Sequence, residues 1–111
     1  MSKQASELWN KKSNAQLVQV LTTIDDAETM RRFLRDALTE KEINEVSARL
    51  MAARMLREGS TYLEIVDKTK LSSRTVARIS SWVQNGCKGY DAAIGIINDD
   101  HHGHTTPARA T

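Results

Sequence analysis

The segment from Leu38 to Val83 constrains the fold most, because helix start and stop signals divide it into three helices. Thr39 and Glu42 have the spacing of a capping box, in which each side chain accepts a hydrogen bond from the backbone amide of the other residue. Apolar residues at helical spacing follow, and Gly59 is the residue type that most readily ends a helix. We therefore predict one long helix between Thr39 and Gly59.

Two short helices separated by a tight turn are predicted after Gly59. Thr61 and Glu64 form a second capping box at the start of the first helix. Leu71 lies in the turn, and the second helix opens on the sequence Ser-Ser-Arg-Thr at residues 72–75. This pattern is typical of the helix-turn-helix, a motif whose second helix enters the major groove of DNA.

The start of the second helix is rich in side chains that can reach base edges or phosphates. The candidate DNA-binding residues are Lys68, Lys70, Ser72, Ser73, Arg74, Thr75 and Arg78. The free amides at a helix N-terminus also favour a phosphate. An interpretation without DNA stays open, in which Ser72 or Ser73 only caps the helix while Arg74 and the two lysines are solvated.

The segments on either side of this motif are also predicted to be helical. Residues 6–24 carry apolar residues at helical spacing towards their end, and Asp25 with Glu28 has the spacing that starts a further helix. A last helix is expected from Tyr90 to Ile97. Because no strand is predicted, we expect an all-α fold of six helices.

The domain organisation follows from length and composition. The 111 residues suffice for one domain, which we place at residues 1–97. The only proline is Pro107, so nearly all of the chain is free to be helical. Residues 98–111 contain no apolar residue other than alanine and are expected to be a disordered tail.

Charge and hydropathy narrow the possible partners and the compartment. The net charge is +2, and residues 60–86 carry four basic against two acidic residues, a modest excess that is compatible with phosphate contacts. No segment approaches the roughly 20 apolar residues of a membrane span, so we expect no membrane partner. Cys87 is the only cysteine, which excludes an intrachain disulfide and fits a cytoplasmic protein.

Catalytic and metal-binding patterns are weak. The chain has no glycine-rich phosphate loop after a strand and no nucleophile–base pair, so we do not expect an enzyme. The suitable metal ligands lie near the C-terminus: Asp99, Asp100, His101, His102 and His104. A flexible tail of this kind binds divalent metals weakly and lacks residues that orient the ligands, so no functional metal site is predicted. Cys87 is expected to be a lone surface thiol.

The segment from about residue 30 to residue 97 resembles the Trp repressor superfamily, in particular its Trp-repressor-like branch of the YerC/YecD type. The resemblance rests on FLRDALTEKEINEVSARLMAARMLREG followed by TYLEIVDKTKLSSRTVARIS. Four features fit the pattern of this family. They are the Leu-Thr-x-x-Glu opening, the arginine ten residues after that threonine, the Leu-Arg-x-Gly exit and the Thr-Val-x-Arg-Ile helix. The resemblance implies an all-helical Trp-repressor-like fold, an intertwined homodimer, and DNA reading by the fourth and fifth helices.

The N-terminal third of the chain independently favours a homodimer. It carries more large apolar side chains than a small monomer needs: Leu8, Trp9, Leu17, Leu21 and Phe33. We therefore expect residues 1–38 to supply much of a dimer interface. Two-fold symmetry would also set two reading helices one turn of DNA apart.

The resemblance further implies a site for free L-tryptophan at three positions of this sequence: Thr39, Arg49 and Arg78. Ile79 and Trp82 depart from the family, whose members have small residues there to admit the indole. A Trp82 ring folded inward would fill the slot, whereas a ring pointing into solvent would leave it open. We expect poor binding of L-tryptophan and no cofactor. Arg49 would then form an internal salt bridge, for example to Glu45.

The predicted function is that of a sequence-specific transcriptional regulator that binds double-stranded DNA as a dimer and represses by covering its operator. The predicted helix-turn-helix departs from the family at two positions: Lys70 replaces the usual glycine of the turn, and Val66 replaces a small residue of the first helix. Two alternatives stay open. One is a helix-turn-helix protein-interaction module without specific DNA binding, and the other is a repressor that responds to tryptophan or another small molecule.

Overall fold

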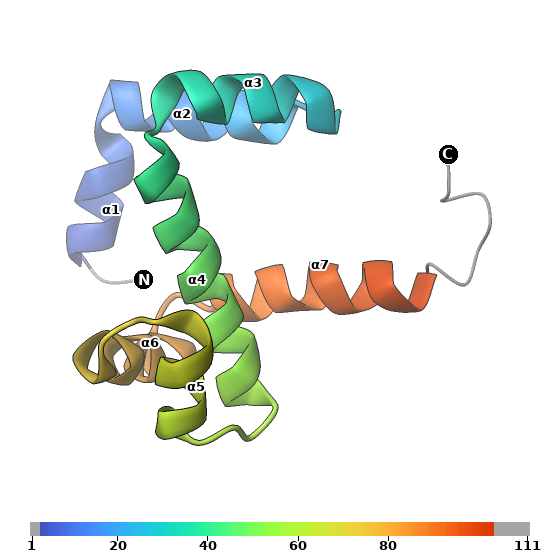
Figure 1. The fold of residues 1–111 in the computed structure, drawn as a ribbon. Coiled ribbons are helices and arrows are strands. Elements are labelled where there is room, and N and C mark those ends of the chain that lie inside the picture. Colours follow the sequence, from blue (N-terminus) through green and yellow to red (C-terminus); the bar gives the residue numbers. More distant parts are fainter. Residues whose placement is uncertain (1–2, 104–111) are drawn as a thin grey trace. The chain divides into compact units, whose positions relative to one another are not determined.

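The computed structural model describes the backbone of residues 3–103 and the side chains of residues 7–99. In this range every regular element is a helix, which confirms the all-α class. The helices are α1 (Lys3–Asn10), α2 (Lys12–Thr23), α3 (Ala27–Ala37), α4 (Glu40–Arg57), α5 (Tyr62–Thr69), α6 (Ser73–Asn85) and α7 (Gly89–Gly103) (Figure 1). Their internal contacts divide the chain into an N-terminal unit, residues 1–43, and a C-terminal unit, residues 44–111.

The N-terminal unit begins with two helices where one was expected. The backbone of Lys11 is extended, with φ −68° and ψ 124°, and this breaks the predicted helix over residues 6–24 into α1 and α2. The polar run around Lys11 offers no apolar side chain to hold a continuous helix face against a neighbour. The amide of Asn14 bridges the break by donating from Nδ2 to the carbonyl of Leu8 over 3.0 Å. The described residues therefore hold seven helices, not six.

The start of α3 also differs from the expectation. The N-cap is Asp26, whose Oδ2 accepts from the amide of Thr29 over 2.8 Å, so the prediction that Asp25 caps this helix was wrong. This hydrogen bond lowers the pKa of Asp26, because it stabilises the charged carboxylate. Glu28 does not reach back to the cap. Its carboxylate lies 3.3 Å from both Arg31 and Arg32 instead.

Neither α2 nor α3 contains a buried residue. Three large apolar side chains of α2 are exposed: Leu17, Val18 and Val20. On α3, Met30, Phe33 and Leu34 are only half-buried. Within a single chain, the described part of the N-terminal unit therefore has no hydrophobic core of its own.

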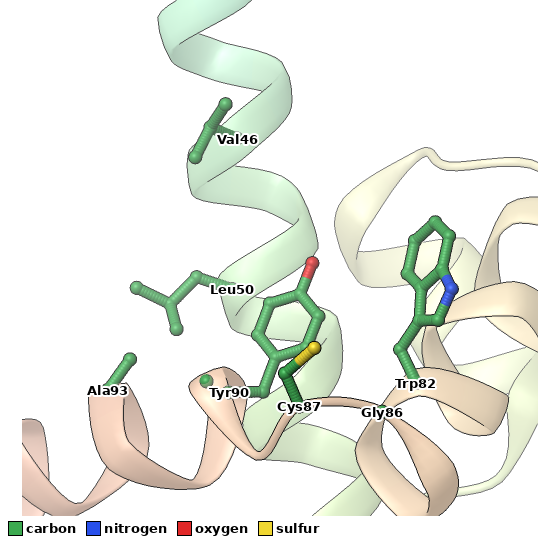
Figure 2. Close-up of a pocket in the computed structure, with 8 residues that line it drawn as sticks. Val46, Leu50, Trp82, Gly86, Cys87, Tyr90 and Ala93 are labelled. Atoms are coloured by element: carbon green, nitrogen blue, oxygen red, sulfur yellow. The ribbon is translucent and has the colours of Figure 1, made fainter. Parts of the chain in front are cut away.

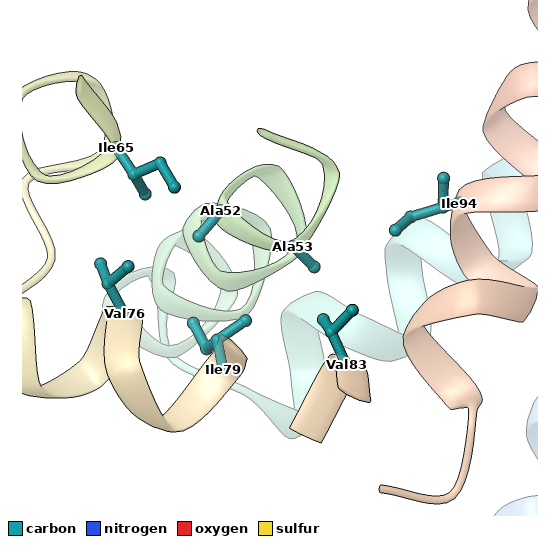
Figure 3. Packing of buried hydrophobic residues seen from close by; sticks show 7 residues of the cluster. All are labelled: Ala52, Ala53, Ile65, Val76, Ile79, Val83 and Ile94. Atoms are coloured by element: carbon teal, nitrogen blue, oxygen red, sulfur yellow. The ribbon is translucent and has the colours of Figure 1, made fainter. Parts of the chain in front are cut away.

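The C-terminal unit does have a core, to which all of its helices contribute. Its buried apolar residues are Ala52, Ala53, Ile65, Val76, Ile79, Val83 and Ile94. Figure 3 shows Ala52 of α4 on the side of Ile65 and Val76, and Ala53 on the side of Val83 and Ile94. Two consecutive alanines let the neighbouring helices approach α4 closely, so this small core can be densely packed.

The helix boundaries of this region follow the predicted signals. In the first capping box, Thr39 N donates to Glu42 Oε1 over 2.8 Å and Glu42 N donates to Thr39 Oγ1 over 3.1 Å. The box of Thr61 and Glu64 has the same pair of bonds, at 2.7 and 3.2 Å. Gly59, with φ +90°, follows the end of α4 as expected.

The last helix is longer than predicted. We expected it to end near Ile97, but α7 continues to Gly103. Residues 104–111 lie outside the described part of the chain, so the prediction of a disordered tail stays a prediction there. None of the described helices is long and apolar enough to cross a membrane.

Candidate DNA-binding surface

The α5–turn–α6 segment forms the predicted helix-turn-helix. The two helices pack through Ile65 and Val76, both of which are fully buried. Between them Lys70 adopts a left-handed conformation, with φ 64° and ψ 13°, and its amide donates to the carbonyl of Val66 over 2.8 Å. This is the position where the resemblance expects glycine, the residue that tolerates a positive φ best. The turn thus keeps the geometry of the motif although it carries a lysine.

Two of the predicted DNA-binding hydroxyls are engaged inside the protein. Ser72 is the N-cap of α6, and its Oγ accepts from the amide of Thr75 over 3.1 Å. The same hydroxyl donates to Thr75 Oγ1 over 3.0 Å, and Thr75 is half-buried. The capping interpretation therefore holds for Ser72. Both residues therefore help to fix the start of α6, and the proton of the Ser72 hydroxyl is used within the protein.

The remaining face of α6 is open to solvent. We give the name reader face to five of its exposed residues: Ser73, Arg74, Ala77, Arg78 and Ser81. The opposite face is buried and consists of Val76, Ile79, Ser80 and Val83. Within the described residues neither Arg74 nor Arg78 forms an ion pair, so both guanidinium groups are available to a ligand.

The reader face includes two residues that were missed in the sequence. Ala77 and Ser81 follow Ser73 at intervals of four residues, and helical periodicity alone could have placed them beside the two arginines. Neither residue is charged, and both lie beyond the cluster of polar residues that opens the helix. A methyl group can also discriminate between bases, since thymine presents a methyl in the major groove.

The two predicted lysines are exposed near the reader face. Lys68 lies on α5, and Lys70 lies in the turn. Nζ of Lys70 is 3.9 Å from Oδ1 of Asp67, and both side chains are at least 80% exposed. Such a pair contributes little and leaves the lysine able to contact an anion.

The three residues matched to a tryptophan site lie in different surroundings. Thr39 belongs to the N-terminal unit, and its hydroxyl and amide are both engaged by Glu42. The hydrogen bond from the Thr39 amide also lowers the pKa of Glu42, because it stabilises the carboxylate. In the C-terminal unit, Arg78 is exposed on the reader face and Arg49 is half-buried on α4.

The expected salt bridge of Arg49 to Glu45 is not formed. Nε of Arg49 is buried and has no hydrogen-bond partner among the described residues. Its charge acts instead on Tyr90, whose pKa it lowers, although burial has the larger effect and raises that pKa overall. Arg49 is half-buried on α4 while Glu45 is exposed, and no ion pair joins them, so the predicted pair was wrong.

An apolar pocket of about 480 Å³ lies between α4, α6 and α7 (Figure 2). Its lining residues are Val46, Leu50, Trp82, Gly86, Cys87, Gly89, Tyr90 and Ala93. Trp82 borders this pocket and is 47% exposed, so of the two alternatives left open, the ring does not fill this pocket. Ile79 is fully buried. None of the three predicted ligand residues lines the pocket.

The remaining candidate groups are Cys87 and the histidines near the C-terminus. Cys87 is exposed, as expected for a lone surface thiol. The side chains of His101, His102 and His104 lie outside the described residues, so the prediction that the tail holds no functional metal site stays a prediction. In the part whose side chains are described, no cluster of three potential metal ligands is found.

Comparison with known proteins agrees with the geometry. Residues 12–96 match the family model of the Trp repressor protein. The chain is 34% identical over 84 residues to the protein YerC of Bacillus subtilis (strain 168), a match that covers 76% of this chain and 81% of that protein.

Two solved structures have the same fold. A TrpR-like protein from Eubacterium eligens ATCC 27750 superimposes with a TM-score of 0.76 at 32% identity, over 81% of this chain and 93% of that one. A candidate Trp repressor from Staphylococcus aureus superimposes with a TM-score of 0.79 at 28% identity, over 87% and 96% of the two chains. The helical architecture, the helix-turn-helix and the sequence match agree, and the chain belongs to the Trp repressor family.

Proposed function

We propose that this protein is a sequence-specific transcriptional regulator that binds double-stranded DNA and represses by covering its operator. The observation that carries the proposal is the reader face of α6. Two unpaired arginines project from a helix whose opposite side is locked into the core through Val76 and Ile79. A helix held in this way can enter a major groove without losing its own packing. We place this activity in the cytoplasm, where the single thiol of Cys87 would stay reduced.

The start of α6 is also suited to a phosphate. Ser72 satisfies the amide of Thr75 and the first intrahelical bond goes from Val76 N to Ser72 O, which leaves the amides of Ser73 and Arg74 without an acceptor in the described part of the chain. The positive end of the helix dipole lies at the same place. Lys68 and Lys70 supply further positive charge close by. These groups would position α6 on the DNA backbone, while base contacts from the reader face would supply the specificity.

We further propose that the regulator is a homodimer. The absence of any buried residue from α2 and α3 means that a single chain cannot compensate for the entropy lost when these helices are ordered. A second copy would cover the exposed apolar residues of α2 as well as the open pocket beside Trp82. Two-fold symmetry would then set two copies of α6 about 34 Å apart, one turn of DNA.

The proposal is tested by titrating the full chain with a random-sequence duplex at several salt concentrations. Because each phosphate contact releases a counterion, the affinity should fall steeply as salt rises. Arg74→Ala and Arg78→Ala should each weaken binding, whereas Arg35→Ala, which removes an exposed arginine of α3, serves as the matched control. Affinity that is independent of salt and unaffected by the two reader-face substitutions would contradict the proposal.

A second candidate function is a protein-interaction module. It is favoured by Tyr62 and Leu63 at the start of α5, since Leu63 is 82% exposed and Tyr62 is also exposed. Apolar residues on the first helix of the motif are unusual for a surface that faces only DNA and water. This candidate predicts weak binding to DNA with a shallow dependence on salt, so the same titration separates the two functions.

A further inference from the structure

We infer that three side chains of the reader face divide the recognition of DNA between them: Arg74 reads a guanine, Ala77 contacts the methyl group of a thymine, and Arg78 holds a phosphate. The inference rests on the proposed function and specifies its target. Each half-site would contain a guanine and a nearby thymine in the major groove, and replacement of either should weaken binding.

Three hydroxyl groups of α6 and its cap are poorly placed to contact DNA bases. The Ser72 and Thr75 hydroxyls are bonded to each other, and the Ser72 hydroxyl also accepts from the Thr75 amide. Ser80 is buried, and its Oγ accepts from Gln84 Nε2 over 3.3 Å. The Ser72 hydroxyl is therefore committed to capping the helix, the Thr75 side chain is half-buried and the Ser80 side chain is buried, so these three are poorly placed to reach base edges. Base contacts fall to the exposed side chains.

The three exposed residues lie close together on α6. At 3.6 residues per turn, Arg74, Ala77 and Arg78 lie within about 100° of one another around α6. The rise of about 1.5 Å per residue separates Arg74 and Arg78 by about 6 Å along the axis, with Ala77 beside them. This span corresponds to about two base-pair steps, so all three can face one short stretch of groove.

The two arginines differ in what they can contact, because they lie at different distances from the start of α6. An arginine donates two parallel hydrogen bonds to the O6 and N7 of guanine, the commonest specific contact in the major groove. Residues near the N-terminus of the second helix approach the bases, whereas those further along approach the flanking backbone. Arg74 is the second residue of α6 and Arg78 lies one turn later, which assigns guanine to Arg74 and phosphate to Arg78.

Ala77 supplies the remaining contact. Its side chain is a single exposed methyl group that can neither donate nor accept a hydrogen bond, so it gains most from the methyl of thymine. A small residue at this position also lets the backbone of α6 approach the bases. The preference for thymine should therefore depend on the base methyl itself.

The test begins with selection of bound duplexes from a random pool by the full-length protein. Replacement of the selected guanine should weaken binding of the wild type by about 5- to 150-fold, and this dependence should vanish in Arg74→Ala. Arg78→Ala should keep the base preference but reduce the slope of log affinity against log salt by about one. Base preference that survives Arg74→Ala and is lost in Arg78→Ala would overturn the assignment.

The thymine contact is tested with deoxyuridine, which lacks only the methyl. This replacement should weaken the wild type by about fourfold, the value of one buried methyl-sized group, and should not affect Ala77→Gly. Because glycine weakens a helix, Ala77→Ser provides a second variant without the methyl, and circular dichroism reports whether each variant is folded. Equal affinity of the wild type for thymine and deoxyuridine would overturn this contact.

Failure of this inference differs from failure of the proposed function. If the wild type binds duplex DNA with a steep salt dependence but shows neither preference, only the division of roles is wrong. If it shows no salt-dependent binding to any duplex, the proposed function and the inference both fail.

Discussion

Arg57 and Asp91 form an ion pair through two parallel hydrogen bonds: Nε donates to Oδ1 and Nη2 donates to Oδ2, each over 2.9 Å. Nη2 of Arg57 also donates to the carbonyl of Val83 over 3.2 Å. One guanidinium therefore joins the end of α4 to the first turn of α7 and to the last turns of α6. The fork of arginine matches a carboxylate in this way, and a lysine could not reproduce both bonds.

This pair predicts how stability depends on pH. Hydrogen bonding to Arg57 lowers the pKa of Asp91, so the pair stabilises the folded state above the unfolded pKa of about 4 and ceases to do so as the pH falls through the folded pKa. Asp91→Asn should therefore melt below the wild type at pH 7, and the difference should shrink as the pH falls below about 4 and through the folded pKa. Thermal unfolding across this range measures it, with Asp67→Asn as the exposed control. A melting difference that stays constant with pH would refute this explanation.

The conformation of Lys70 predicts a stabilising substitution. A side chain in the left-handed region costs roughly 1–2 kcal/mol, and glycine removes this cost. Only part of it is recovered as stability, because glycine has more freedom to lose from the unfolded chain. Lys70→Gly should therefore raise the free energy of unfolding by about 0.5–1 kcal/mol. Urea denaturation measures the change.

Two control variants separate this effect from the loss of charge. Lys70→Ala removes the ammonium but keeps a Cβ at φ 64°, so it should not be stabilising. Lys68→Gly introduces glycine within α5 and should lower stability by roughly 1 kcal/mol. The interpretation would be untenable if Lys70→Gly were no more stable than Lys70→Ala.

The core predicts a sharp contrast between two neighbouring residues of α5. Ile65 is fully buried against α4 and α6, whereas Leu63 is 82% exposed. Ile65→Ala should lower the free energy of unfolding by about 2–5 kcal/mol, while Leu63→Ala should change it by less than about 0.5 kcal/mol. Chemical denaturation of both variants is the measurement. A large loss of stability in Leu63→Ala would show that a partner covers this residue in solution.

The helices from α4 to α6 were predictable because their signals are local. The capping boxes at Thr39 and Thr61, the stop at Gly59 and the spacing of Val76, Ile79 and Val83 each depend on residues a few positions apart. Their hydrogen bonds and burial follow directly from that spacing.

The errors concern features that local patterns do not determine. The break at Lys11 falls in a run of polar residues whose spacing neither continues nor ends a helix. The cap at Asp26 depends on which of two adjacent aspartates takes an extended backbone, and either residue can cap a helix. The surroundings of Arg49 and Trp82 depend on packing between helices that are distant in sequence. No pattern of spacing could show that Nε of Arg49 is buried without a partner, or that Trp82 borders a pocket formed with α7.

The proposed homodimer predicts a mass in solution of twice the 12.4 kDa of one chain. Light scattering at tens of micromolar should give this mass for the wild type. Leu17→Asp should reduce it, because the substitution places a charge on the exposed apolar surface of α2. Gln19→Asp adds the same charge to a polar position of the same helix and should leave the dimer intact. A monodisperse wild-type monomer would rule out the dimer.

The last prediction is that L-tryptophan binds poorly, so that DNA binding does not depend on it. The Thr39 hydroxyl is engaged by Glu42, and the open pocket beside Trp82 has no charged residue in its lining. A free amino acid would bring an ammonium and a carboxylate into these apolar surroundings, where each loses hydration without finding a partner. Calorimetry should therefore detect no saturable binding tighter than about 100 µM, a free energy near −5.5 kcal/mol.

Indole is the matched control ligand, because it keeps the aromatic ring and lacks both charges. If an apolar pocket is all that the site offers, indole should bind at least as tightly as L-tryptophan. Tight, saturable binding of L-tryptophan that is lost in Arg49→Ala or Arg78→Ala would reverse the conclusion. Those arginines would then be holding the carboxylate, and a rearrangement around Arg49 would have to give its buried, unpaired Nε an anionic partner.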